Sequence, residues 1–471
     1  MRSRYSKIPI CEVEVDLSQN LGPLNQMRHQ FGRGGVNHVP FPDNIIEGVK
    51  KIGHNKIRVF LQEYFFPYPE SGKPDWSRLD AFMESFERMG VNVVADLTIK
   101  PSVLYPTIDQ SIFMPNDVKE WQELVSAMVK RYSVDKKIVT EWEILNETDI
   151  GERGVTPFLI PNPEDYYRYY KITTDAILRT CPECKVGGPA VASYDNEVLE
   201  GLLKLCSENN TQLDFVSWHM YNDDPGGFSN ATRYVNDLID RYYPNNKPEQ
   251  LLTEWNLVRF GDFHYFEMTQ EPRWAAFVTA AILEMMDAGL DWSYIYDIWD
   301  QYIVMDDFKK FMSEETNKYL YAWCSEEPLF LGVFGMGNEV HTPYFAYYLL
   351  SRMASTKAGV SVSIHGSTIP QLMIPNDVYT TASYDAGRAT VLISNYDKES
   401  SYEKLLGVKF TGLVPGLKKM IVYRVDDERK WDKNSLDMEP VEERIFYSED
   451  TFRPLIYSPA DSVTFVELID I

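Results

Sequence analysis

Two glutamates stand at the ends of apolar, β-like runs of the sequence. Glu147 ends the run 141–147, Glu254 follows an apolar stretch, and each has an asparagine, Asn146 or Asn256, within two positions. Two carboxylates that face each other across a sugar can cleave a glycosidic bond, because one protonates the leaving oxygen while the other attacks the sugar carbon. Lone glutamates are usually solvated, but two in this setting predict a catalytic pair.

The pair needs a scaffold, and the order of the predicted elements supplies one. Short β-like runs alternate with longer helical segments, whose apolar residues recur at spacings of three and four, as in 116–132. Eight strands each followed by a helix predict a (β/α)₈ TIM barrel, of class α/β. A doubly wound sheet is disfavoured because no Gly-rich phosphate loop follows the first run. The eight runs are 31–35, 56–61, 91–97, 141–146, 185–188, 213–219, 251–254 and 294–297.

A barrel of this kind would bring the two glutamates together. Glu147 ends the fourth run and Glu254 ends the seventh. Reacting groups in such barrels lie at the C-terminal ends of the strands and in the loops that follow. Strands four and seven stand on opposite sides of an eight-stranded ring, so we expect the two carboxylates to point at each other across its mouth.

The sequence changes in character past residue 360. Short alternating runs are separated there by Gly, Pro, Asn and Asp, which predicts an appended all-β sandwich. Residues 12–17 also alternate, and we expect them to pair with that C-terminal sheet. The predicted domains are therefore a catalytic barrel over 26–355 and a β-sandwich accessory domain made of 1–25 plus 356–471.

Composition narrows the classes of partner and cofactor. A net charge of −24 argues against nucleic acid and against a polyanionic substrate. No run approaches the ~20 apolar residues of a membrane span, so no membrane partner is expected. The oligomeric state is open, with a homo-oligomer as one option. The compartment is open between cytoplasmic and, if a signal peptide has been removed, periplasmic or secreted.

The cysteines and histidines indicate no metal site and no cofactor. The five cysteines are an odd number and imply no disulfide framework. Cys181 and Cys184 have the spacing of a redox or half-zinc motif, but no second such pair exists. They also precede a strand, at the floor of the predicted barrel, so a structural or incidental role is expected. No His-Glu-x-x-His cluster appears, and cleavage by two carboxylates needs no metal.

Several longer segments together form a recognisable pattern. They are Ile57-Arg58, Glu143-Ile144-Leu145-Asn146-Glu147, Lys185-Val186-Gly187-Gly188-Pro189-Ala190, Asp214-Phe215-Val216-Ser217-Trp218-His219-Met220-Tyr221, Thr253-Glu254-Trp255-Asn256, Phe334-Gly335-Met336 and Pro343-Tyr344-Phe345. Asn-Glu alone is a weak signal, but Asn-Glu, His-x-Tyr and Thr-Glu-x-Asn in this order are specific together. The sequence resembles glycoside hydrolase family 39, the family of retaining β-xylosidases and α-L-iduronidases.

The resemblance implies roles for individual residues. Glu147 would be the general acid and then the base, and Glu254 the nucleophile. Asn146 would donate to the sugar 2-hydroxyl, while His219 and Tyr221 would orient the nucleophile and contact the sugar. Three further residues each leave an alternative open. Arg58 would hold the nucleophile ionised, contact substrate or form a buried ion pair, and Tyr296 and Trp299 would form a stacking wall or belong to the core.

Two departures from the family pattern bear on the substrate. Thr148-Asp149 follows the acid where the family usually has Pro, and no His follows Arg58 in the second run. The reaction is therefore better indicated than a preference for xylosides. We expect a retaining, exo-acting hydrolase of a carbohydrate substrate, a β-linked glycoside such as a β-xyloside, working through a covalent glycosyl-enzyme. The alternatives are an endo-acting polysaccharide hydrolase of the same clan and a catalytically silent carbohydrate-binding barrel.

Overall fold

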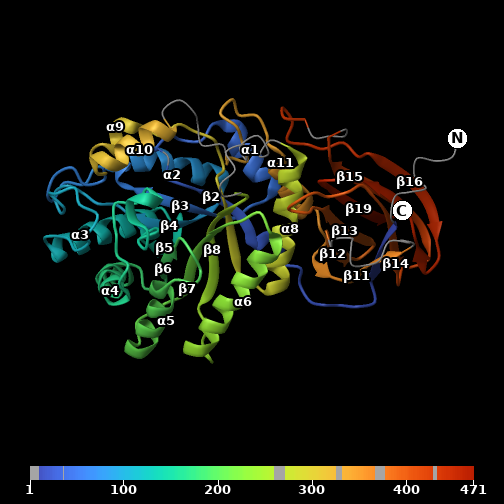
Figure 1. The fold of residues 1–471 in the computed structure, drawn as a ribbon, viewed down its shortest axis with the longest axis horizontal. Coiled ribbons are helices and arrows are strands. Elements are labelled where there is room, and N and C mark those ends of the chain that lie inside the picture. Colours follow the sequence, from blue (N-terminus) through green and yellow to red (C-terminus); the bar gives the residue numbers. More distant parts are fainter. Residues whose placement is uncertain (1–9, 36, 259–270, 325–330, 366–376, 428–431) are drawn as a thin grey trace.

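A closed barrel of eight parallel strands forms one half of the molecule, which confirms the predicted TIM barrel (Figure 1). The computed structural model describes residues 10–35, 37–258, 271–324, 331–365, 377–427 and 432–471. The barrel strands are β2 (His29–Arg33), β3 (Lys56–Gln62), β4 (Asn92–Thr98), β5 (Val139–Ile144), β6 (Lys185–Val191), β7 (Phe215–Tyr221), β8 (Glu249–Asn256) and β9 (Trp292–Tyr296).

Helices surround the barrel and bury their apolar faces on it. The residues at the start of α4 show why a helix forms there: Asn162 caps the backbone N–H of Asp165 at 3.0 Å, and Pro163 occupies the first turn. No helix among the described residues is long and apolar enough to cross a membrane. The helices are α1 (Asp43–Ile52), α2 (Ser77–Met89), α3 (Val118–Val129), α4 (Pro163–Thr180), α5 (Glu197–Asn209), α6 (Pro225–Tyr242), α8 (Pro272–Ala288), α9 (Met305–Phe308), α10 (Glu314–Cys324) and α11 (Thr342–Ser351).

Side chains fill the barrel interior in layers. Val94, Phe215, Leu251 and Tyr294, contributed by four different strands, form a buried apolar cluster. Residues two positions further along a parallel strand lie one layer nearer to its C-terminal end. The layer above this cluster therefore receives the polar residues at the strand ends, such as Asp96, two positions after Val94 on β4. The polar groups at the barrel mouth therefore lie directly above this apolar cluster.

The C-terminal part folds into two mainly antiparallel sheets, and strand β1 joins one of them. Its residues pair antiparallel with β11 and parallel with β14, which confirms the pairing expected for the N-terminal strand. One sheet contains β11 (Gly359–His365), β1 (Ile10–Asp16), β14 (Lys404–Thr411), β17 (Thr451–Phe452) and β18 (Leu455–Ser458). The other contains β10 (Thr356–Lys357), β12 (Val378–Asp385), β13 (Arg388–Asn395), β19 (Ser462–Asp470), β15 (Gly416–Val425) and β16 (Glu442–Ser448).

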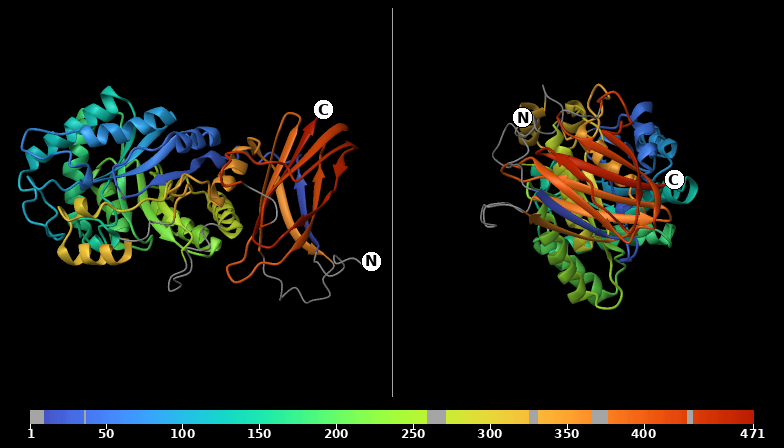
Figure 2. Two further views of the ribbon diagram at one scale, coloured as in Figure 1. Left: turned by 90° about the horizontal axis from the view of Figure 1, so that it is seen from above. Right: turned by 90° about the vertical axis from the view of Figure 1, so that its right-hand side faces the viewer.

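Helices α8 and α11 lie between the barrel and the two sheets (Figures 1 and 2). Polar contacts cross this junction: the hydroxyl of Ser394 donates to the carbonyl of Ala276 at 2.6 Å, and Arg273 pairs with Asp461 at 2.9 Å. The sheets therefore rest on the outside of the barrel. The domain boundaries at 25/26 and 355/356 stay a prediction.

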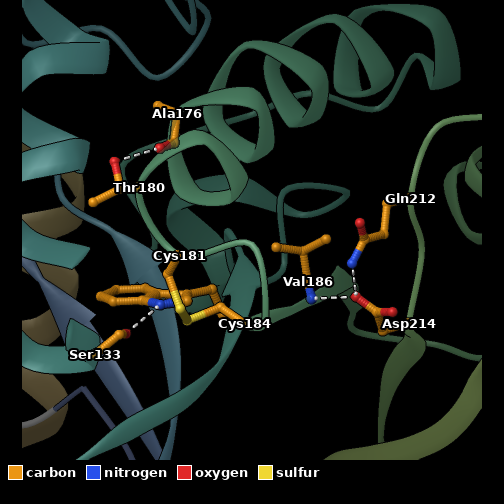
Figure 3. Close-up of a disulfide and its surroundings, with 9 residues drawn as sticks. Ser133, Ala176, Thr180, Cys181, Cys184, Val186, Gln212 and Asp214 are labelled. Carbon is orange, nitrogen blue, oxygen red and sulfur yellow. Dashed lines mark hydrogen bonds between the residues drawn. A yellow bond between two sulfur atoms is a disulfide. The ribbon is translucent and has the colours of Figure 1, made fainter. Parts of the chain in front are cut away.

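Cys181 and Cys184 form a disulfide between the end of α4 and the start of β6 (Figure 3). Both residues are buried. The disulfide lies at the N-terminal end of the barrel strands, whereas the two glutamates lie at the C-terminal ends. Since both sulfurs are bonded to each other, they do not form half of a zinc site here.

Candidate active site

Glu147 and Glu254 lie next to each other at the barrel mouth. One oxygen of Glu147, one of Glu254 and a ring nitrogen of His219 are all within 4.8 Å of one another. Retaining glycosidases hold their two carboxyl groups about 5–5.5 Å apart, whereas inverting enzymes leave about 6.5–9.5 Å for a water molecule. Both residues are less than one-tenth exposed. The structure thus brings the predicted pair together, at a spacing that suits direct attack by one carboxylate.

A tight turn after β5 positions Glu147. Leu145 and Glu147 both have positive φ angles, of 65° and 44°, which non-glycine residues rarely adopt. The Glu147 N–H donates to the carbonyl of Ala190 at 2.8 Å, and the Glu147 carbonyl accepts from Ile150 and Gly151 at 3.1 and 2.9 Å. Hydrogen bonds on both sides hold this backbone in its unusual conformation.

His219 orients the carboxyl of Glu147. Its Nδ1 lies 2.9 Å from Oε1 of Glu147, and burial lowers the pKa of His219 to about 4, so the ring is neutral at pH 7. A neutral ring with its proton on Nδ1 donates to Oε1 and leaves Oε2 as the oxygen that can carry a proton. Burial, followed by the charge of Asp149, raises the pKa of Glu147 to about 8. Glu147 is therefore protonated at neutral pH, as a general acid must be.

Both oxygens of Glu254 have donors. The Tyr221 hydroxyl donates to Oε1 at 2.5 Å, and Nη1 of Arg58 donates to Oε2 at 3.2 Å. Burial and the nearby Glu147 raise the pKa of Glu254, while His219, Arg58 and the Tyr221 hydrogen bond oppose that rise. The resemblance places His219 and Tyr221 together at the nucleophile, whereas the structure bonds His219 to Glu147 and Tyr221 to Glu254.

Arg58 is the centre of a buried polar network beneath the pair. The side chain is 1% exposed. It bonds Glu143 at 2.8 Å, Asp96 at 2.7 Å and the amide oxygen of Asn146 at 2.5 Å, besides Glu254. Arg58 therefore forms a buried ion pair and contacts Glu254 at once. The bond to Asn146 also directs the amide NH₂ of that residue away from Arg58, so that the NH₂ can donate to another group.

Removal of Arg58 is expected to destabilise the fold. Arg58→Leu leaves Asp96, Glu143 and Glu254 buried without their cation, and loss of one partner of a buried ion pair typically costs about 3–5 kcal/mol. Urea unfolding of both proteins measures the change in the free energy of unfolding. Arg88→Leu, which breaks an exposed pair with Asp43, serves as the control and should have little effect. Equal stabilities of the Arg58 and Arg88 variants would contradict the network's role.

The structure places the two predicted aromatic residues differently. Tyr296 is half-buried, lies close enough to Tyr221 to affect its pKa, and presses against Gly34, where a Cβ would sit 1.6 Å from the ring. Tyr296 therefore lies beside Tyr221, near the two glutamates. The ring of Trp299 lies 5.9 Å from that of Phe41 and packs against the core. These contacts are those of a core residue rather than those of a residue that stacks on a sugar.

Gly154 is a residue of the site that the sequence did not reveal. A Cβ there would lie 2.1 Å from Oε2 of Glu147 and 2.9 Å from Cδ1 of Ile150. The absence of a side chain at this position is what lets the carboxyl adopt its observed position. No sequence pattern marks this glycine. By contrast, Glu143 and Asp96 stand out as charges within otherwise apolar runs, which is a signal for buried, paired groups.

Gly154→Ala is expected to lower activity with little loss of stability. The methyl group displaces the flexible end of Glu147 and leaves the backbone unchanged, and a displacement of ~1 Å at a reacting group can reduce the rate about 100-fold. Steady-state kinetics and thermal unfolding measure the two effects. Gly226→Ala, where the nearest atom is 3.3 Å away, is the matched control. Wild-type kcat in the Gly154 variant would show that this contact does not position the acid.

A cluster of this kind could instead bind a metal ion. Among the residues that the structure describes, one group has potential ligand atoms close enough together to hold an ion: Glu147, His219 and Glu254. The Arg58 guanidinium already lies 3.2 Å from Glu254, and Glu147 favours its protonated form. A dication would have to displace that proton and lie near a fixed positive charge. The charges therefore suit acid–base chemistry better than metal binding.

Comparison with known proteins agrees with this geometry. The β-xylosidases of Geobacillus stearothermophilus and Caldicellulosiruptor saccharolyticus are each 24% identical, over 41% and 64% of this chain. The alignments span only 40% and 61% of those two relatives. A monomeric β-xylosidase from Caulobacter crescentus CB15 shares the fold, with a TM-score of 0.72 at 16% identity over 98% of this chain and 99% of its own. The family model of the glycosyl hydrolases family 39 matches residues 48–457. The chain therefore belongs to glycosyl hydrolase family 39.

Proposed function

We propose that the protein is a retaining glycoside hydrolase that works by double displacement. The observation that carries the proposal is the buried pair of carboxyl groups, whose oxygens approach within 4.8 Å and whose surroundings differ. Glu147 has a pKa of about 8 and is held by a neutral histidine, whereas Glu254 accepts from a guanidinium and a phenol. Two carboxyl groups with separate protonation states are what an acid and a nucleophile require.

The first half of the proposed reaction forms a covalent intermediate. Glu254 attacks the anomeric carbon while Glu147 gives its proton, from Oε2, to the leaving oxygen, so that one C–O bond forms as the other breaks. Asn146 donates to the sugar 2-hydroxyl, a bond that strengthens as positive charge develops on the sugar ring. The hydrogen bonds that Arg58 and Tyr221 donate to Glu254 weaken as its carboxylate loses its negative charge on forming the ester.

The second half returns the enzyme to its starting state. Glu147, now ionised, takes a proton from water, and the resulting hydroxide equivalent attacks the anomeric carbon and releases Glu254. Two inversions give net retention of configuration. The same group thus serves as acid and then as base, and its pKa must fall when Glu254 loses its charge.

We propose an exo-acting enzyme on β-linked glycosides such as β-xylosides. The names of the two curated relatives support a xyloside, and the departures around Asp149 and after Arg58 are reasons to test other sugars. The assay is a panel of nitrophenyl glycosides of xylose, arabinose, glucose, galactose and uronic acids, with the anomer of the first product followed by NMR. A retained β-anomer is expected, and an inverted product would overturn double displacement.

Two outcomes of further assays would replace the exo-acting proposal. An oligosaccharide ladder should lose one sugar at a time, whereas a broad range of early product sizes would indicate an endo-acting polysaccharide hydrolase. Binding to sugars by calorimetry without turnover of any glycoside would indicate a silent carbohydrate-binding barrel.

A further inference from the structure

A cavity of about 810 Å³ lies beside the turn that carries Glu147. Three separate segments form its walls: the loop after β4, the turn after β5 and the N-terminal part of α10. The lining residues are Gln110, Asp149, Ile150, Glu152, Arg153, Leu159, Ser313, Glu315, Thr316 and Tyr319. None of these residues belongs to the catalytic network described above, apart from the effect of Asp149 on Glu147.

The buried carboxylate of Glu152 holds the three walls together. It accepts from the backbone N–H of Ser313 at 3.1 Å and from the hydroxyls of Ser313 and Thr316. The backbone N–H of Glu152 itself donates to Oε1 of Gln110 at 2.8 Å. Hydrogen bonds thus tie α10 to the turn after β5, and that turn to the loop after β4. The cavity is therefore a built part of the fold and not a gap between unconnected loops.

One lining residue of the cavity, Ile150, lies on the side of Glu147 that carries Oε2. Oε2 of Glu147 and the tip of Ile150, a lining residue, both lie within 2.9 Å of the point that a Cβ of residue 154 would occupy. Oε1, by contrast, is bonded to His219. A leaving group that has just accepted the proton from Oε2 would therefore lie on the side of Ile150, away from the ring nitrogen of His219.

We propose that this cavity is the leaving-group site and that it takes a neutral sugar, which stacks on Tyr319, in preference to an anionic one. The inference rests on the proposed glycosidase function. Tyr319 is 54% exposed and offers a ring of the kind on which the C–H face of a sugar packs. Polar groups such as the Gln110 amide surround the cavity and suit hydroxyls.

The charges at the cavity disfavour an acidic leaving group. Asp149, Glu152 and Glu315 contribute three carboxyl groups against the single guanidinium of Arg153. A uronic acid in the cavity would meet like charges, and such contacts reduce affinity, whereas a neutral sugar avoids them. Glu315 is exposed, so its charge can be reversed without disturbing the core.

The test uses the glycosyl-enzyme trapped with a 2-deoxy-2-fluoro glycoside of the sugar that the nitrophenyl panel identifies. Its reactivation is measured in water, with methyl β-xyloside and with methyl β-glucuronide as acceptors, because an acceptor enters through the leaving-group site. Tyr319→Ala should slow reactivation by methyl β-xyloside about tenfold, the equivalent of 1.4 kcal/mol of lost ring contact. Reactivation by water should not change. Tyr321→Ala, on the other face of α10, is the control and should behave as wild type.

A charge reversal tests the second half of the proposal. Glu315→Lys should raise the rate with methyl β-glucuronide several-fold relative to methyl β-xyloside. Failure to trap any glycosyl-enzyme would count against the proposed function. If the enzyme is trapped but neither Tyr319→Ala nor Glu315→Lys changes the reactivation rates, the leaving-group site is wrong. That result would leave the proposed function standing.

Discussion

Glu254→Ala is expected to lower kcat at least ~10⁴-fold, since removal of a covalent nucleophile has effects of this size in other hydrolases. The variant keeps Glu147 and His219 but lacks the group that attacks the sugar. Added azide can occupy the space left by the carboxylate and attack in its place. It should restore partial turnover and give a glycosyl azide of inverted configuration, because only one displacement then occurs. Initial rates and NMR of the azide product measure both effects.

The matched control lies on the same strand. Glu249 pairs with Lys185 at the opposite end of β8, and Glu249→Gln should leave kcat close to wild type. A Glu254→Ala protein with more than a few per cent of wild-type activity, in the absence of azide, would assign the nucleophile to another group.

Glu147→Ala is expected to produce a loss of activity that depends on the leaving group. A dinitrophenolate leaves without a proton, whereas an alkoxide needs one, so alkyl or sugar glycosides should lose about 10²–10⁴-fold more in kcat/KM. Azide attacks the glycosyl-enzyme without base catalysis, and should give a glycosyl azide of retained configuration. Equal losses for good and poor leaving groups would contradict the assignment of the acid.

The pH dependence of kcat/KM should show the same division of roles. Glu147 must be protonated, so activity should be present below its pKa of about 8 and fall as the pH rises through that value. Glu254 must be ionised, so activity should fall at acid pH through a pKa that burial raises above the usual one. The two groups interact, so the two limbs report the pair as a whole. With a dinitrophenyl substrate, Glu147→Ala should lose the basic limb, and persistence of that limb would point to a different acid.

Periodicity predicted the scaffold and the pair because both depend on local pattern. Strand runs and helical spacing indicated the eight repeats, and the barrel then placed Glu147 and Glu254 at one mouth. The partners of His219 and Tyr221 depend instead on contacts between separate segments. A register shift between β7 and β8, for example, sets His219 opposite Glu254. Such a shift arises from packing between strands and leaves no pattern within either strand.

Local sequence pattern did not predict the side-chain networks or the close contacts between residues that are distant in the sequence. Arg58 left three alternatives open because its partners come from three other segments, and the structure shows the buried ion pair and the contact with Glu254 at once. Gly154 matters only because the carboxyl of Glu147 folds back over it. The cavity at Glu152 likewise depends on where α10 docks, which short-range sequence spacing does not determine.

The most direct test is to identify the residue that carries the covalent intermediate. The enzyme is incubated with a 2-deoxy-2-fluoro glycoside, and the protein is analysed by intact mass and then by peptide mapping. We expect one sugar per chain, attached through an ester to Glu254. A sugar attached to Glu147 or to any other residue would contradict it, as would turnover with inversion and no covalent adduct.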